Sequence, residues 1–178
     1  MTDETKGTAS VGAVHSGPRP FETIVYGGLA IGILDFLDAS IFFPLYFGIS
    51  FLDVWHGPAS GLIGREASRG GGVNTALLGI FLHFVVATCI ATVYYLASRY
   101  ISFLIRRPII SGLVFGVIAN LVMQWVVIPL SAIGYRPPAT TIDWGSQMNS
   151  YIGHALLVGL PVALIAAWSA RKNARKAG

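Results

Sequence analysis

Six polar side chains lie inside stretches of the sequence that are otherwise apolar, and these residues are the ones that could do chemistry. They are two carboxylates, two imidazoles and two amides. A charged group near the centre of a bilayer costs at least about 2.5–3.5 kcal/mol, so such residues face a bundle interior and contact one another. We call these six residues the polar layer: Asp35, Asp38, His83, Asn120, Gln124 and His154.

The polar layer allows several kinds of site. It could be a structural polar core, with an aspartate paired to a histidine, or a proton or ion pathway, because Asp and His chains act as relays in membranes. Two histidines and two carboxylates (His83, His154, Asp35 and Asp38) are also ligand types for zinc, iron or manganese. However, the sequence has no His-x-x-x-His or Glu-x-x-His spacing of the kind found in metal sites. Haem ligation by His83 and His154 is also disfavoured, because the two histidines lie at unequal depths. We therefore predict no cofactor.

Composition and hydropathy indicate a membrane-integral chain. The 178 residues are 54% hydrophobic and 11% charged, whereas soluble domains have about 25% charged residues. Four apolar runs exceed the roughly 20 residues that a transmembrane helix needs. The sequence thus predicts an all-α, antiparallel bundle of four transmembrane helices, at about 23–46, 73–98, 108–132 and 148–169. These spans form one domain of residues 22–170. A disordered tail (1–21) precedes the domain and a basic tail (171–178) follows it.

The basic residues predict the orientation. Nine of the 12 Lys and Arg residues flank the two termini or the 99–107 turn, and three, Arg65, Arg69 and Arg136, lie in the other connections. By the positive-inside rule, both termini are then cytoplasmic. The basic residues lie at helix ends and not on a folded basic face, so no nucleic-acid partner is predicted. The bilayer is the expected partner, with a second copy or another membrane protein as further possibilities.

Two longer connections lie on the predicted outer side. Residues 49–74 mix apolar and polar residues, which fits a short interfacial helix stopped at Gly57-Pro58 or at Gly70-Gly71-Gly72, although a plain loop fits nearly as well. Residues 133–147 should be irregular because two prolines follow Arg136. His15 in the tail and His56 in the first connection have no visible partner and are interpreted as solvated.

Small and polar residues share one face in three of the spans. Gly112, Gly116, Asn120 and Gln124 recur every four residues, which predicts a packing face. Counted at 1.5 Å per residue, most of the polar layer falls roughly 9–17 Å below the outer surface, so all four helices contribute to one layer. If the helices pack in sequence order, Asp35 can meet His83.

Known catalytic motifs are absent from the sequence: it has no Gly-x-Ser-x-Gly, Walker loop or dinucleotide fingerprint. The sequence therefore favours two functional classes over an enzyme. The first is a structural or interaction protein, and the second is a proton- or metal-ion-handling permease or transporter subunit. The single cysteine, Cys89, allows no intrachain disulfide.

Several blocks of the chain resemble the YagU-like group of bacterial four-helix inner-membrane proteins. The similar blocks contain Asp35 (GLAIGILD), His83 (ALLGIFLHF), Pro129 (VVIPLSA) and His154 (HALLVGLP), and the likeness covers about residues 23–168. The resemblance implies a small protein of the bacterial inner membrane with no established biochemical activity, and it leaves the mechanism open.

Overall fold

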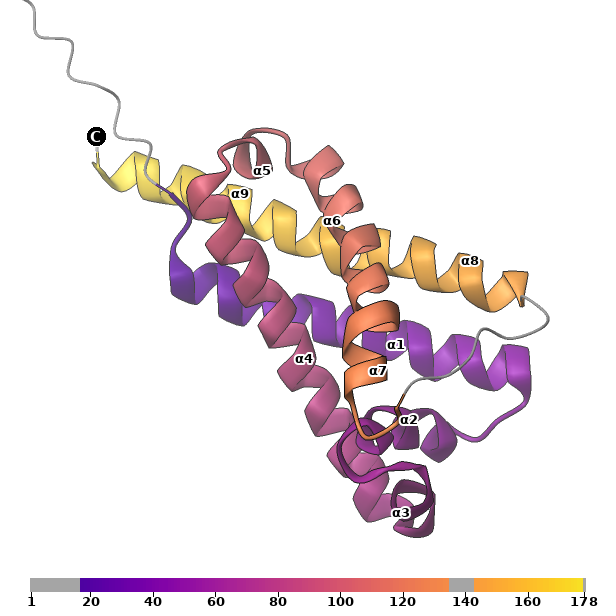
Figure 1. The fold of residues 1–178 in the computed structure, drawn as a ribbon. Coiled ribbons are helices and arrows are strands. Elements are labelled where there is room, and N and C mark those ends of the chain that lie inside the picture. Colours follow the sequence, from indigo (N-terminus) through magenta and orange to yellow (C-terminus); the bar gives the residue numbers. More distant parts are fainter. Residues whose placement is uncertain (1–16, 135–142, 178) are drawn as a thin grey trace, which may run out of the picture.

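The computed structural model describes residues 17–134 and 143–177, which are helical apart from short connections and contain no strand. Within this part of the chain, four helices are long and apolar enough to cross a membrane (Figure 1). The predicted all-α bundle of four spans is therefore confirmed. The spans are Glu22–Phe47, Gly72–Tyr100, Pro108–Leu130 and Trp144–Lys176.

Three of the spans consist of consecutive helical elements joined end to end. The first is η1 (Glu22–Tyr26) and α1 (Gly27–Phe47), and the second is α4 (Gly72–Tyr100). The third is α6 (Pro108–Val122), η2 (Met123–Val127) and α7 (Ile128–Leu130), and the fourth is α8 (Trp144–Gly153), η3 (His154–Gly159) and α9 (Leu160–Ala177). The connecting helices are α2 (Phe51–Ile63), α3 (Arg65–Gly70) and α5 (Phe103–Arg106).

The first span packs against both the second and the fourth, and the third packs against the fourth. In Figure 1, α1 lies alongside α8 and α9, and α4 crosses them at an angle. The second and third spans meet near α5, where the ring of Tyr94 packs 4.9 Å from that of Phe115. The spans therefore neighbour one another in the order second, first, fourth, third. We call the end with α2 and α3 the cap side, and the end with Glu22 the terminal side.

Glycines bring the third and fourth spans into close contact. A Cβ on Gly116 would collide with the carbonyl of His154, and one on Gly159 would collide with the carbonyl of Gly112. The predicted packing face of the third span is thus confirmed. Gly159 lies on no polar stripe in the sequence, and it is nevertheless packed as tightly as Gly116.

Two π-helical turns, η2 and η3, each end two residues before a proline, Pro129 or Pro161. Proline cannot donate a backbone hydrogen bond, and its ring clashes with the carbonyl four residues earlier. In η3 the N–H of Leu160 instead donates to Ala155, five residues back, which widens the turn ahead of the ring. Such turns are frequent at functional sites, and these two carry members of the polar layer, Gln124 and His154.

The connection between the first two spans is helical and covers the cap side (Figure 1). A capping box between Ser50 and Asp53 starts α2. The helix continues through Gly57-Pro58, contrary to one predicted stop, and ends before Gly64. Burial of Trp55 and Ala59 offsets the hydrogen bond that Pro58 cannot make. A helix in this connection, as predicted, is thus confirmed.

Candidate functional site

The polar layer forms two groups joined through the first span, not one continuous cluster. His83 and Asp35 form a pair between the second and first spans, with 3.9 Å from Nδ1 to Oδ2. Asn120 and Gln124 contact the fourth span instead, through Ser150. The first span reaches the fourth through Asp38, whose Oδ2 accepts a hydrogen bond from Asn149 Nδ2 at 3.0 Å.

The ring of His83 has a fixed tautomer when it is neutral. Its Nε2 lies 3.0 Å from the backbone oxygen of Gly32. A carbonyl oxygen can only accept, so Nε2 carries a hydrogen and donates it. The atom that gains or loses a proton is then Nδ1, which faces Asp35. The pair therefore places a titratable nitrogen beside a carboxylate between two membrane helices.

The carboxylate of Asp35 is less completely bonded than the imidazole. Its side chain is 24% exposed, and within the described part of the chain it forms the pair with His83 but no hydrogen bond. Asp38 lies one turn further along the same helix. Asp35 thus lies between two other titratable groups of the polar layer, His83 and Asp38.

Aromatic rings cover the pair on the cap side. The ring of Trp55, from α2, packs edge-on against His83 with centroids 5.1 Å apart. Trp55 also stacks on Phe36 at 4.5 Å, and its side chain is almost completely buried. The cap helix therefore fills the space above the pair with apolar surface.

The amide group joins the third span to the fourth. Ser150 Oγ donates to Asn120 Oδ1 at 2.7 Å, and Gln124 Nε2 donates to the same oxygen at 3.2 Å. His154 donates through Nδ1 to the carbonyl of Ser150, 3.0 Å away, so its titratable nitrogen is Nε2. Asn120 is buried, and its Nδ2 has no hydrogen-bond partner among the residues that the structure describes. Asn149 and Ser150 were missed in the sequence, although both lie about one turn before His154.

The four metal-ligand candidates do not converge. Among the described residues, no group of three or more His, Cys, Asp or Glu side chains could hold a metal ion. His83 and Asp35 provide two donors, while His154 and Asp38 are each bonded elsewhere. The metal site considered from the sequence has no support in this geometry.

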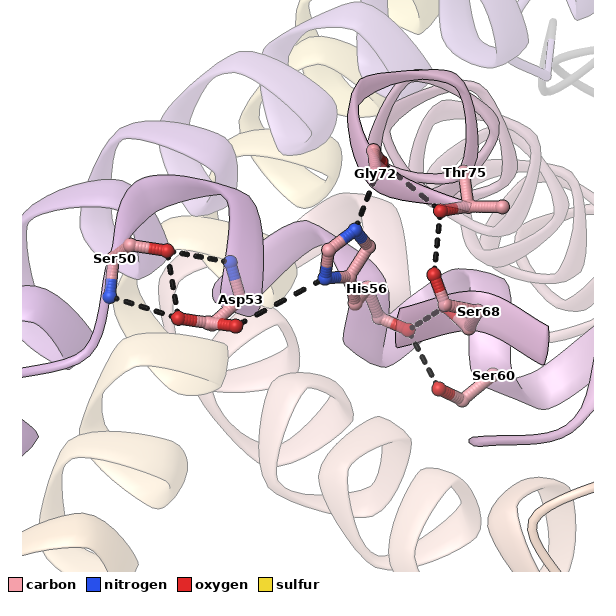
Figure 2. Close-up of polar contacts among 7 residues, drawn as sticks. All are labelled: Ser50, Asp53, His56, Ser60, Ser68, Gly72 and Thr75. Atoms are coloured by element: carbon pink, nitrogen blue, oxygen red, sulfur yellow. Dashed lines mark hydrogen bonds and ion pairs between the residues drawn. The ribbon is translucent and has the colours of Figure 1, made fainter. Parts of the chain in front are cut away.

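His56 belongs to a buried network in the cap, so the prediction that it is solvated is wrong (Figure 2). Its Nε2 lies 2.9 Å from the carbonyl of Gly72, and therefore donates to it. Its Nδ1 is buried, lies 4.0 Å from Asp53 Oδ1 and forms no hydrogen bond with any described residue. The backbone oxygen of His56 accepts from both Ser60 and Ser68. This network ties α2 and α3 to the start of α4. His15 lies outside the described residues.

Hydrogen bonds hold Asp53 in its charged form. The backbone N–H and the hydroxyl of Ser50 both donate to Asp53 Oδ2, at 3.1 and 2.6 Å (Figure 2). These bonds lower the pKa of Asp53, and nearby His56 and Arg69 add a smaller effect in the same direction.

A buried carboxylate, Glu22, lies on the terminal side and was also missed in the sequence. Glu22 Oε1 lies 2.6 Å from Lys172 Nζ, and Oε2 accepts from Ser169 at 2.9 Å. The backbone N–H of Arg19 donates to the same serine hydroxyl. The cluster fastens the start of the first span to the end of the fourth. Glu22 directly precedes the predicted first span, so a search for polar residues within the spans did not include it.

Comparison of the chain with family models, with curated proteins and with solved structures found no match. The function is therefore argued from the geometry of the site.

Proposed function

We propose that this protein is a membrane-integral structural or interaction protein whose polar layer holds its helices in register. The observation that supports this most is that the layer links neighbouring spans in turn. His83 bonds the second span to Gly32 of the first, Asn149 bonds the fourth to Asp38 of the first, and Ser150 bonds the fourth to Asn120 of the third. Each such bond between membrane helices contributes about 0.6 kcal/mol on average.

We further propose that the protein lies in a bacterial inner membrane with both termini in the cytoplasm, as in the YagU-like proteins that it resembles. The basic residues on the terminal side, including Arg99, Arg107 and Lys172, support this orientation. Membrane-impermeant thiol labelling of single-cysteine variants in a cysteine-free background should modify Arg136→Cys and spare Arg175→Cys. The reverse pattern would invert the orientation.

The structural role can be tested on the third and fourth spans. Ser150→Ala removes the donor to Asn120 and should lower the free energy of unfolding in detergent micelles by about 1 kcal/mol. Ser40→Ala is a matched control, because the buried Ser40 hydroxyl has no hydrogen-bond partner within residues 17–134 and 143–177, and its removal should be neutral or stabilising. Equal losses in the two variants would contradict the structural role of the polar bonds.

A proton-handling permease or transporter subunit is the second proposal. It is favoured by the incomplete bonding of Asp35, whose carboxylate faces the titratable nitrogen of His83. Asp35→Asn keeps the size of the side chain and removes its proton exchange. In proteoliposomes with a pH-sensitive dye, this variant should fold normally and lose any proton flux that the wild type shows. Flux that is unchanged in the variant would contradict the proposal.

A further inference from the structure

Asp38 lines a shallow, open depression on the first span. The depression has a volume of about 400 Å³ and is lined by Asp38, Ile41, Phe42, Leu45 and Tyr46. Small-molecule sites have volumes of about 300–1,000 Å³ and combine apolar walls with a few polar groups. One carboxylate surrounded by four apolar or aromatic side chains has this composition.

The charge of Asp38 is incompletely compensated. Its Oδ2 accepts one hydrogen bond from Asn149, and no Lys or Arg in the described part of the chain forms an ion pair with it. The other carboxylate nearby, Asp35, lies one helical turn away, has the same sign and cannot compensate this charge. A carboxylate inside a membrane span is normally paired. The depression therefore favours a positively charged occupant.

The aromatic walls suit the same occupant. The rings of Phe42 and Tyr46 stack with centroids 5.0 Å apart. Tyr46 is held in place by its hydroxyl, which donates to Asp143 Oδ1 at 2.8 Å. Aromatic faces attract organic cations, and the neighbouring aliphatic side chains offer contact to apolar substituents. Leu45 is 82% exposed, so the depression opens toward the surroundings of the helix.

We propose that this depression binds a lipophilic monovalent cation, such as an organic ammonium or phosphonium ion with apolar substituents. Asp38 compensates the charge, while the rings and aliphatic side chains contact the substituents. A hydrated inorganic cation would make no use of the apolar walls, and a neutral amphiphile would leave the carboxylate unpaired. This binding site does not depend on whether the polar layer is structural or carries protons.

The test measures binding of tetraphenylphosphonium to the full-length protein in lipid nanodiscs by equilibrium dialysis. Tetraphenylborate, which has the same shape and the opposite charge, is the control probe. The wild type should bind the cation saturably. It should bind the anion at least about tenfold more weakly, because the negative charge of Asp38 repels tetraphenylborate. Asp38→Asn should weaken cation binding about tenfold. Glu66→Gln, which removes an exposed charge from α3, should leave it unchanged.

A second variant keeps the proposal falsifiable if Asp38→Asn does not fold. Phe42→Leu retains an apolar wall and removes one ring, and it should weaken cation binding about threefold. Size-exclusion chromatography and circular dichroism of each variant would verify folding. The proposal is overturned if the wild type binds no cation saturably, if the anion binds equally well, or if Asp38→Asn and Phe42→Leu both bind as the wild type does.

Discussion

The membrane bundle and its cap each contain an aspartate beside a histidine, and the two pairs differ in what surrounds the carboxylate. The Asp35–His83 and Asp53–His56 pairs have Nδ1 to oxygen distances of 3.9 and 4.0 Å. In both, Nε2 donates to a backbone carbonyl. However, Asp53 is 52% exposed and accepts two hydrogen bonds from Ser50, whereas Asp35 is 24% exposed and accepts none within the described part of the chain.

This difference shows that pair geometry alone does not determine the role of an Asp–His contact. In the cap, solvent and Ser50 satisfy the carboxylate, so Asp53 depends little on His56. In the bundle, the histidine is the principal compensation for Asp35, because lipid and apolar side chains supply no donors. We therefore expect the two pairs to respond differently to the same substitutions.

The largest effect is expected for the pair in the bundle. Asp35→Ala or His83→Ala alone leaves a polar partner uncompensated and should lower the free energy of unfolding by about 3 kcal/mol, whereas the double variant should lose less than the sum. Unfolding in detergent micelles measures both. The matching cycle of Asp53→Ala and His56→Ala should show weak coupling, because Asp53 is exposed. Equal coupling in the two cycles would mean that the surroundings of the carboxylate are unimportant.

A smaller loss of stability is expected when glycines of the bundle are replaced by alanine, and a glycine of the cap serves as the comparison. Gly116→Ala and Gly159→Ala should each destabilise by about 1–3 kcal/mol, because the added Cβ meets the backbone of the facing span. Gly57→Ala is the control in the cap, where no atom of the described residues lies within 4 Å of a Cβ and alanine favours the helix. Thermal unfolding in the same detergent compares the three variants. Destabilisation by Gly57→Ala as large as the others would indicate that the cap is packed as closely as the bundle.

The smallest effect is the pH dependence that Asp53 contributes in the cap. The pKa of Asp53 is lowered below its ordinary value of 3.8, so its charged form stabilises the folded state above that pH. The contribution decreases as the pH falls below this value and is lost once the pH has passed the lower pKa of the folded state. The difference in stability between the wild type and Asp53→Asn should therefore shrink on acidification. A difference that grows at low pH would contradict this assignment.

The four spans could be predicted because apolar runs of this length have few alternatives, but their ends depend on local bonds. The fourth span begins at Trp144, before the predicted Met148, because Asp143 acts as its N-cap. The Asp143 side chain accepts a hydrogen bond from the backbone N–H of Ser146. The residues that follow this cap are largely polar, so hydropathy alone does not detect the start of the helix.

The pairing of Asp35 with His83 was predictable from depth and helix face, and the structure brings the two residues together. The buried position of His56 was not, because it depends on a bond to Gly72, 16 residues away, that forms when α2 and α3 fold over α4. Sequence periodicity describes one element at a time and contains no signal for such a contact. The links from Asn120 to Ser150 also depend on the packing of two spans.

The glycine contact between Gly112, Gly116 and Gly159 also limits how the bundle can move. Backbones packed this closely cannot slide continuously past each other, because interdigitated surfaces resist small displacements. We therefore expect the third and fourth spans to move together. A rearrangement of the bundle would then be a hinge or shear motion of this pair against the first two spans. The bond between Asp38 and Asn149 crosses that boundary and would be among the first to break.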